Sequence, residues 1–327
     1  MVRRHTVAPA VIAALRLQGI KIPDSLAAEV QATSARALHL TKELHRLHRR
    51  LNEAGIPFLT VKGPALAQWL HGSVTSRHYT DLDILTRPED ARAAISILEA
   101  DGFSPIAGPP PGYEDRWMSR AWEARHIHPD QRVVEIHWAL FPPGRGDEGL
   151  TEAAWSHATT LPVADREVPV PAPEDHAAFI ILHGHRHGWQ RLQWLIDADA
   201  CIQRLGLAAF RRQAQAEGFR RRLDSTLLAC DTLLGTSYQI QADRPTRRLT
   251  RIALKALFQG RPMTRLEAAR FNVLALDTPQ ARRRAALWYL RPGPADWGEA
   301  PRHSGWAWTY YLTRPFQLMG RMLRRSR

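Results

Sequence analysis

The chain has 327 residues, of which 44% are hydrophobic and 24% are charged, a composition that excludes an intrinsically disordered protein. Its longest uninterrupted apolar runs, 10–15 and 177–182, have six residues each, whereas a membrane-spanning helix needs about 18. We therefore expect no integral membrane segment. Cys201 and Cys230 are the only cysteines, too few for a disulfide framework or a thiolate zinc site, which favours a cytoplasmic location.

Lysine and arginine (45) outnumber aspartate and glutamate (32), for a net charge of +13. Residues 201–327 hold 24 basic and 8 acidic residues, whereas residues 1–200 have a net charge of −3. A basic surface attracts polyanions, but 41 arginines beside four lysines are also typical of a GC-rich genome. The aromatic and arginine-rich segment 306–327 is expected to dock as a last helix, with peripheral contact to an anionic membrane surface or to RNA as alternatives.

Helical periodicity is clear from Asp24 to Asn52, where apolar residues recur at three-, four- and seven-residue spacings. Four elements are predicted after it: a strand over 58–62 (FLTVK), a short helix entered through Gly63 and Pro64, a strand over 82–86 (LDILT) and a helix over 88–101. Strands and helices that alternate in this way indicate an α/β opening.

Two further strands, over 121–128 and 132–140, are joined by turn residues at 129–130. Beyond the proline-rich stretch 169–175, nearly every segment to about residue 291 has helical character. We therefore predict an α/β (α+β) fold: a small mixed sheet with flanking helices, plus a mainly helical C-terminal domain. The expected parts are a helical segment over 1–54, an α/β core over 55–170 and a strongly basic helical domain over 171–327.

Three acidic residues have a distinctive context. Asp81 and Asp83 alternate with Leu82 and Ile84, so on a strand both carboxylates project from one face while the apolar residues enter the core. Glu135 has a similar setting on a later strand. Carboxylates on adjacent strands repel one another unless a cation lies between them, and Mg²⁺ or Mn²⁺ would fill that role. The alternative is three solvated acids on an ordinary sheet face.

Other polar residues are weaker candidates. Lys62 and Gly63 lie at a strand-to-helix turn, where backbone N–H groups and the helix dipole favour phosphate. His183 and His187 share a helix face, but no HExxH glutamate accompanies them, so a structural or substrate-side role is favoured over zinc. His137 shares the face of the third acid and is a candidate to reach the substrate.

Four segments in this order, VKGPALAQWLHG, SRHYTDLDIL, VVEIHWAL and LHGHRHGWQRLQWLIDADA, resemble the uncharacterised nucleotidyltransferase family of the polymerase-beta-like nucleotidyltransferase superfamily. The resemblance runs from about residue 55 to residue 200. It implies the following roles: Asp81, Asp83 and Glu135 as catalytic metal ligands; Lys62, Gly63 and Arg77 as nucleotide-binding residues; and His183, Gly184, His187, Trp194 and Asp197 as the downstream helical signature. Apart from the resemblance, we expect Asp197 to be a hydrogen-bond anchor between helices.

The resemblance implies metal-dependent transfer of a nucleoside monophosphate from an NTP, with ATP expected, to a hydroxyl or phosphate of an acceptor, and release of pyrophosphate. A peptide or protein, an RNA and a small metabolite all stay open as the acceptor. One departure is that Gly63 is followed by Pro64, which lacks an N–H, and lies 18 residues before Asp81. The alternative is therefore a catalytically silent protein that binds nucleotide or a partner.

Overall fold

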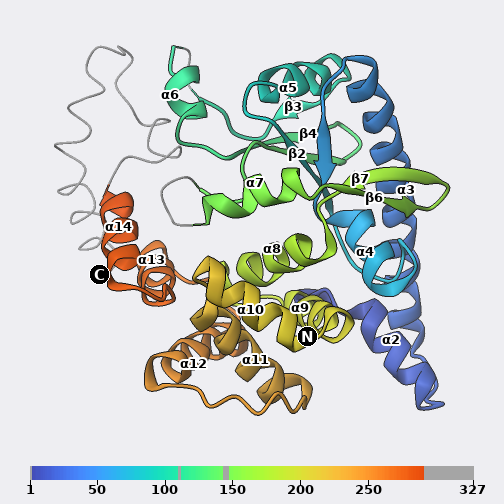
Figure 1. The fold of residues 1–327 in the computed structure, drawn as a ribbon. Helices are drawn as coiled ribbons and strands as arrows, with labels where there is room; N and C mark the ends of the chain where they lie inside the picture. The colour runs from blue at the N-terminus through green and yellow to red at the C-terminus, as the bar shows by residue number, and fades with distance from the viewer. Residues whose placement is uncertain (1, 110–111, 143–146, 291–327) are drawn as a thin grey trace, which may run out of the picture.

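The computed structural model describes residues 2–109, 112–142 and 147–290, which form a mixed sheet, a separate hairpin and a set of helices (Figure 1). The helices are α1 (Val2–His5), α2 (Ala8–Leu17), α3 (Asp24–Glu53), α4 (Gly63–His71), α5 (Ala91–Ala100), α6 (Glu114–Met118), α7 (Glu148–Ser156), α8 (Pro173–Arg186), α9 (Leu192–Leu205), α10 (Leu207–Glu217), α11 (Arg220–Leu234), α12 (Arg244–Gln259), α13 (Arg265–Leu274) and α14 (Pro279–Leu290). The strands are β1 (Phe58–Thr60), β2 (Asp81–Thr86), β3 (Ser104–Pro105), β4 (Glu123–Ile127), β5 (Val133–His137), β6 (Thr159–Val163) and β7 (Arg166–Val170). The predicted last helix at 306–327 lies outside the described residues.

The main sheet has the strand order β1-β2-β5-β4-β3. β2 and β5 run parallel, and the other neighbouring pairs run antiparallel. The predicted α/β fold with a small mixed sheet is confirmed. The register places Asp83 on β2 opposite Glu135 on β5, and Arg125 on β4 opposite the same glutamate. Three charged residues that are distant in the sequence therefore form one row across the sheet.

Both faces of β2 are covered, by different layers. Leu82 and Ile84 belong to an apolar cluster with α3 and α5, and both are fully buried. Leu85, on the opposite face, packs with α8 and the helices that follow it. Helix α3 runs along one side of the molecule, and α8 crosses below β2 and α7 in the view of Figure 1. Because successive strand residues point to opposite faces, Asp81 and Asp83 lie on the side of Leu85, towards α8.

A glycine in the LHGHRHGW stretch has a steric explanation. Trp189 is fully buried after the end of α8, and a Cβ atom on Gly184 would lie 2.1 Å from its ring. A residue with a side chain at this position would have to displace a buried tryptophan. This part of the helical signature is therefore needed for packing.

Some predicted boundaries need correction. The helix predicted from residue 88 begins at Ala91, because a turn closed by the Asp90 N–H and the Arg87 carbonyl precedes it. The hairpin of β6 and β7 was not predicted, since Pro162 and Pro169 lie within its strands and proline argues against a strand.

The expected boundary at 169–175 covers the end of β7 and the start of α8, and only residues 171–172 lie between the two elements. One apolar cluster nevertheless joins Leu59 and Val61, at β1, with residues from α8 to α13. The division into three parts stays a prediction. Within the described ranges, no helix combines the length and apolar character needed to span a membrane.

Candidate active site

A cavity of about 340 Å³ lies between the carboxylate face of the sheet and helices α8 and α9. Its walls come from the turn between β1 and α4, from β2, β4 and β5, and from both helices. Asp81, Asp83 and Glu135 all line it, together with Lys62 and His137. The acids predicted from two separate sequence segments therefore face a single cleft.

Asp83, Glu135 and His137 form a group, within the part of the chain that the structure describes, whose side chains could hold a metal ion. One ligand atom from each lies within 4.8 Å of the others. Strand register explains the group, because Asp83 pairs with Glu135 across β2 and β5, and His137 is two residues further along the same face. Asp83 is 1% exposed, and its Oδ2 atom is buried with no hydrogen-bond partner. An orphaned carboxylate oxygen is costly unless a ligand completes it.

Lys62 provides a positive charge next to these acids. Its Nζ atom lies 2.6 Å from Asp83 Oδ1. Burial alone would lower the pKa of Lys62, but the negative charges of Asp83, Asp81 and Glu135 hold that pKa above its ordinary value. The lysine is therefore charged, and its amine forms a direct ion pair with Asp83, one of the predicted metal ligands.

The two aspartates of the pair have different environments. Burial, followed by the charge of Asp83, raises the pKa of Asp81 to about 6. Burial would also raise the pKa of Asp83, yet Lys62 and His137 hold it well below the usual range. Asp81 lines the same cavity but lies outside the group of Asp83, Glu135 and His137. The pair therefore consists of one carboxylate with cationic partners and one that has no direct partner of this kind in the described part of the chain.

His137 shares the face of Glu135, as expected, and the structure places it between two acids. Its Nε2 atom is 3.2 Å from Asp83 Oδ1 and 3.5 Å from Glu135 Oε2. Burial lowers the pKa of His137, but its hydrogen bonds to these two acids outweigh that effect and raise the pKa to about 10. In this arrangement the ring is an imidazolium, so the acids are neutralised by two protein cations, Lys62 and His137.

Glu135 has a further partner that the sequence did not single out. Arg125 on β4 places its Nε atom 2.5 Å from Glu135 Oε1. The antiparallel pairing of β4 and β5 sets the two residues directly opposite each other. The predicted strands end at residue 128 and begin again at residue 132, and pairing these two ends would have set Arg125 opposite Glu135.

Arg77 and Asp197 form a buried ion pair across 120 residues of sequence. The Nε and Nη2 atoms of Arg77 lie 2.9 and 2.8 Å from Asp197 Oδ2, and Gln193 donates to Asp197 Oδ1 at 2.7 Å. Burial lowers the pKa of Arg77, but Asp197 keeps it raised overall. The predicted nucleotide-binding arginine and the predicted helix anchor are thus direct partners, and they attach the segment before β2 to α9.

This arrangement of acids, lysine and arginine on a mixed sheet agrees with the result of a family comparison. The family model described as "Uncharacterised nucleotidyltransferase" matches residues 1–235 of the chain. The chain belongs to this family. No curated protein matches the chain.

Solved structures of nucleotidyltransferases are distantly similar to this family member. A solution structure of the antibiotic-resistance factor ANT(2'')-Ia has 16% identity and a TM-score of 0.41, over 61% of this chain and 98% of the other. An antigenic nucleotidyltransferase-like protein from Paracoccidioides brasiliensis has 17% identity and a TM-score of 0.36, over 62% and 99%. The lincomycin-bound lincosamide adenylyltransferase LnuA has 17% identity and a TM-score of 0.34, over 49% and 94%.

The two histidines of the family signature form an aromatic wall of the cleft. The rings of His183 and His187 lie 4.8 Å apart, and Trp194 lies 5.6 Å from the first and 5.3 Å from the second. Burial lowers the pKa of His183 well below its ordinary value, so this ring is neutral. All three side chains line the cavity, on the helical side opposite the sheet.

Besides Arg125, sequence reasoning missed other cleft residues, among them Trp122, Glu123 and Arg186. Glu123 is the first residue of β4, Trp122 directly precedes it, and Arg186 is the last residue of α8. They share no short motif with the acids, and only the pairing of strands and the position of α8 bring them into the cleft.

Proposed function

We propose that this protein transfers a nucleoside monophosphate from an NTP to an oxygen of an acceptor molecule, with release of pyrophosphate and with a divalent metal ion bound. The observation that supports this most is the buried group of Asp83, Glu135 and His137, which faces a cavity and contains a carboxylate oxygen without a partner. Membership of the nucleotidyltransferase family supports the same reaction.

The residues present fit a hard metal ion. Carboxylate oxygens are the ligands that Mg²⁺ and Mn²⁺ prefer, so Asp81, Asp83 and Glu135 would hold the ion, and the orphaned Oδ2 of Asp83 is suited to it. When bound, the ion would neutralise phosphate charge and lower the pKa of the attacking hydroxyl. His137 would then orient Asp83 and Glu135 by hydrogen bonds.

The turn between β1 and α4 would bind the triphosphate. Gly63 has a φ of +56°, and a Cβ atom there would lie 3.4 Å from the Asp81 carbonyl oxygen, so glycine allows the turn to pass close to β2. Lys62 would exchange part of its contact with Asp83 for the β- and γ-phosphates. Arg77 uses Nε and Nη2 for Asp197, which leaves the Nη1 N–H groups for a phosphate oxygen.

In the transfer step, the acceptor oxygen bonds to the α-phosphorus, and the bond from that phosphorus to the bridging oxygen breaks. Pyrophosphate leaves with the electron pair of the broken bond. The proton of the acceptor hydroxyl passes to a carboxylate of the cluster, Glu135 or Asp81. Lys62 stabilises the charge that builds on the leaving group.

Binding and turnover of labelled NTPs, with ATP first, in the presence of Mg²⁺ or Mn²⁺ test this proposal. We expect metal-dependent binding of at least one NTP, and we expect Asp83→Asn to reduce it or the following transfer by at least about 100-fold, since even outer-shell changes at metal sites cost 10–100-fold. Asp165→Asn is the matched control, because this acid in the β6–β7 turn is 80% exposed. Binding that needs no metal, or that Asp83→Asn leaves intact, would refute the proposal.

A catalytically silent nucleotide-binding protein is the second candidate, and two observations favour it. A lysine amine already lies on Asp83, and Pro64 removes one N–H from the phosphate turn. NTP binding without release of pyrophosphate, over a range of acceptors that includes peptides, RNA and hydroxylated small molecules, would support it.

A further inference from the structure

Arg186 is a cation of the cleft that has no acidic partner among the described residues. Its guanidinium lies over the ring of Trp122, 5.0 Å from the ring centroid. Within the described part of the chain, no carboxylate oxygen lies within 4.0 Å of it, whereas Lys62, Arg77 and Arg125 each have a carboxylate partner at that distance. The contrast makes Arg186 the cleft arginine of α8 that is still available to a ligand.

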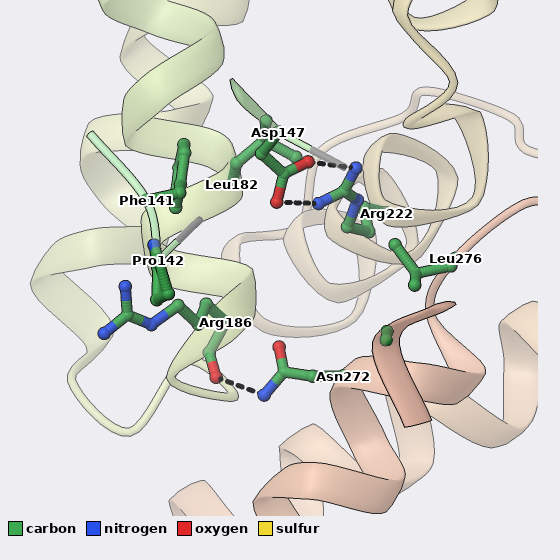
Figure 2. A pocket seen from close by; sticks show the side chains of 9 residues that line it. Phe141, Pro142, Asp147, Leu182, Arg186, Arg222, Asn272 and Leu276 are labelled. Carbon is green, nitrogen blue, oxygen red and sulfur yellow. Dashed lines mark hydrogen bonds and ion pairs between the residues drawn. The ribbon is translucent and has the colours of Figure 1, made fainter. Parts of the chain in front are cut away.

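The nearby acid Asp147 is already occupied. Arg222 binds it through two contacts, of 2.9 and 2.7 Å. Figure 2 shows the guanidinium of Arg186 turned away from this pair, while its main-chain carbonyl accepts a hydrogen bond from Asn272. The backbone of Arg186 is therefore held by α13, and its side chain extends into the cleft.

A guanidinium in this environment has lost water without gaining an anion. Burial lowers the pKa of Arg186, although Glu123 favours its charged form. Asp147 and Glu135 favour the charged form as well, and of these acids Glu123 lies 3.5 Å from His137. The Trp122 ring leaves the planar fork of the arginine free to bind two oxygens side by side, the geometry that suits a carboxylate or a phosphate.

The position of Arg186 indicates which of the two substrates, the NTP or the acceptor, would carry the carboxylate or phosphate that it binds. Trp122 precedes β4, the strand that places Arg125 beside Glu135, whereas Lys62 and Gly63 lie across the cleft, beyond Asp83. If the triphosphate occupies the Lys62 side, as in the proposed function on which this inference rests, a molecule on the Glu135 side is the acceptor. The cavity of about 340 Å³ is at the small end of ligand pockets, which favours a small molecule.

We propose that Arg186, stacked on Trp122, binds an oxyanion of a small hydroxylated acceptor, a carboxylate or a phosphate group. Arg191 reinforces this preference, because it also lines the cleft, lies over the Trp194 ring at 5.6 Å and has no carboxylate within 4.0 Å among the described residues. The cleft therefore selects acceptors that are anionic, and a polycationic acceptor is disfavoured by both arginines.

The test measures how the full-length protein with Mg²⁺, with and without a non-hydrolysable ATP analogue, binds four probes: glucuronate, glucose 6-phosphate, glucose and tobramycin. We expect one of the two oxyanion probes to bind at least about 10-fold more tightly than glucose or tobramycin, as charged hydrogen bonds of this kind provide. The tighter of the two identifies the oxyanion as a carboxylate or a phosphate.

Arg186→Gln should remove the preference for the oxyanion probe over glucose and tobramycin. The affinity for the ATP analogue should stay within about twofold, since the charged hydrogen bonds that this variant loses are made to the acceptor and not to the nucleotide. Arg204→Gln, an exposed arginine of α9, is the matched control. Trp122→Leu is a second variant that should weaken oxyanion binding if Arg186→Gln does not fold.

Glucose or tobramycin binding as tightly as both oxyanions would overturn the inference, as would an unchanged preference in Arg186→Gln. Binding of an RNA oligomer alone, with none of the small probes, would overturn it as well. Failure of the proposed function looks different, because the ATP analogue would then not bind to the unmutated protein, while oxyanion binding that depends on Arg186 would persist without it.

Discussion

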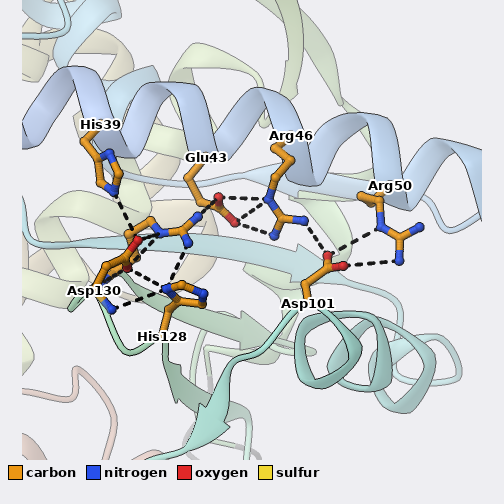
Figure 3. Close-up of polar contacts among 8 residues, drawn as sticks. His39, Glu43, Arg46, Arg50, Asp101, His128 and Asp130 are labelled. Carbon is orange, nitrogen blue, oxygen red and sulfur yellow. Dashed lines mark hydrogen bonds and ion pairs between the residues drawn. The ribbon is translucent and has the colours of Figure 1, made fainter.

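Glu43 on α3 and Asp83 on β2 are both buried acids, 2% and 1% exposed, but their partners differ. Both oxygens of Glu43 are bound, by Arg46 and by Arg132, within the ion-pair network beside α3 that Figure 3 shows. Arg46 also forms an ion pair with Asp101, whose Oδ2 atom lies 2.5 Å from Arg46 Nη1. Asp83 has two cationic partners on Oδ1 and none on Oδ2, and it faces a cavity.

The difference separates a structural role from a binding role. The network beside α3 ties this helix to α5 and to the turn between β4 and β5, and no atom of Glu43 is left without a partner. The carboxylates of the cleft are held close together without being fully satisfied, which costs stability and leaves room for a ligand. Burial of an acid therefore does not mark a site, whereas an unsatisfied atom at a cavity does.

Lys62→Met should have the largest effect, because it changes the cleft cluster alone. We expect NTP-dependent transfer to fall by about 10³-fold, since a cation that stabilises the leaving phosphates is removed. Mn²⁺ should bind more tightly to the variant in the absence of NTP, because no lysine competes for Asp83. Transfer assays and Mn²⁺ titration measure the two results, and weaker Mn²⁺ binding would show that Lys62 supports the metal site.

Glu43→Gln should lower the stability of the fold and leave the cleft unaffected. Breaking a buried ion pair leaves Arg46 and Arg132 without this partner, and we expect the free energy of unfolding to fall by about 3 kcal/mol. NTP affinity at temperatures below the unfolding transition should be unchanged. Urea unfolding measures the loss, and Glu53→Gln on the same helix is the control, because Glu53 is 58% exposed and lies 3.9 Å from Arg49. Equal stability of the two variants would contradict the comparison.

Asp197→Asn tests an intermediate case, a satisfied pair that also borders the cleft. Arg77 and Gln193 donate to different oxygens of Asp197, whereas the amide offers one acceptor oxygen and no charge. One donor would then face an NH2 group, so we expect a loss of about 2 kcal/mol in unfolding free energy. Because Arg77 also lines the cavity, NTP affinity should fall together with stability. A drop in stability with no change in NTP affinity would assign the pair to the fold alone.

His185→Phe should have the smallest effect. Both ring nitrogens of His185 are buried without partners, but the ring stacks on Phe271, 4.8 Å away, and does not border the cleft cavity. Burial lowers the pKa of His185 to about 3. The neutral ring therefore contributes stability that is present above the unfolded pKa of about 6.5 and is lost as pH falls towards 3.

When the pH is lowered from 7 to 5.5, His185 should reduce the free energy of unfolding of the unmutated protein by about 1 kcal/mol. Over the same pH range the free energy of unfolding of His185→Phe should fall by about 1 kcal/mol less. Chemical unfolding at the two pH values measures the difference. Identical pH dependence in both proteins would show that His185 is not kept neutral by burial.

Much of the fold could be predicted from local patterns. The periodicity of α3 and the alternation in β2 were sufficient, since both elements have one face in the core and the other outside it. The same alternation put Asp81 and Asp83 on one face. Local patterns failed for β6 and β7, whose prolines are tolerated because the hairpin forms a separate two-stranded sheet.

The site was only partly predictable, because its remaining contacts are long-range. Residue types and spacing identified Lys62, Asp83 and Glu135 as candidates, but not that the lysine amine would lie on the aspartate. Arg77 and Asp197 were predicted separately, with different roles, and nothing local links residues so far apart in the sequence.

The sequence by itself determined the class of fold, the family resemblance and the acid pair, because these depend on side-chain period and on motifs within a few residues. Tertiary structure decided which charges neutralise one another and which do not. Asp83 Oδ2 and the Arg186 guanidinium are left without an ionic or hydrogen-bond partner in the described structure only because of how β2, β5 and α8 pack. Partner choice depends on distances across the fold, and these distances are set by strand register and helix packing.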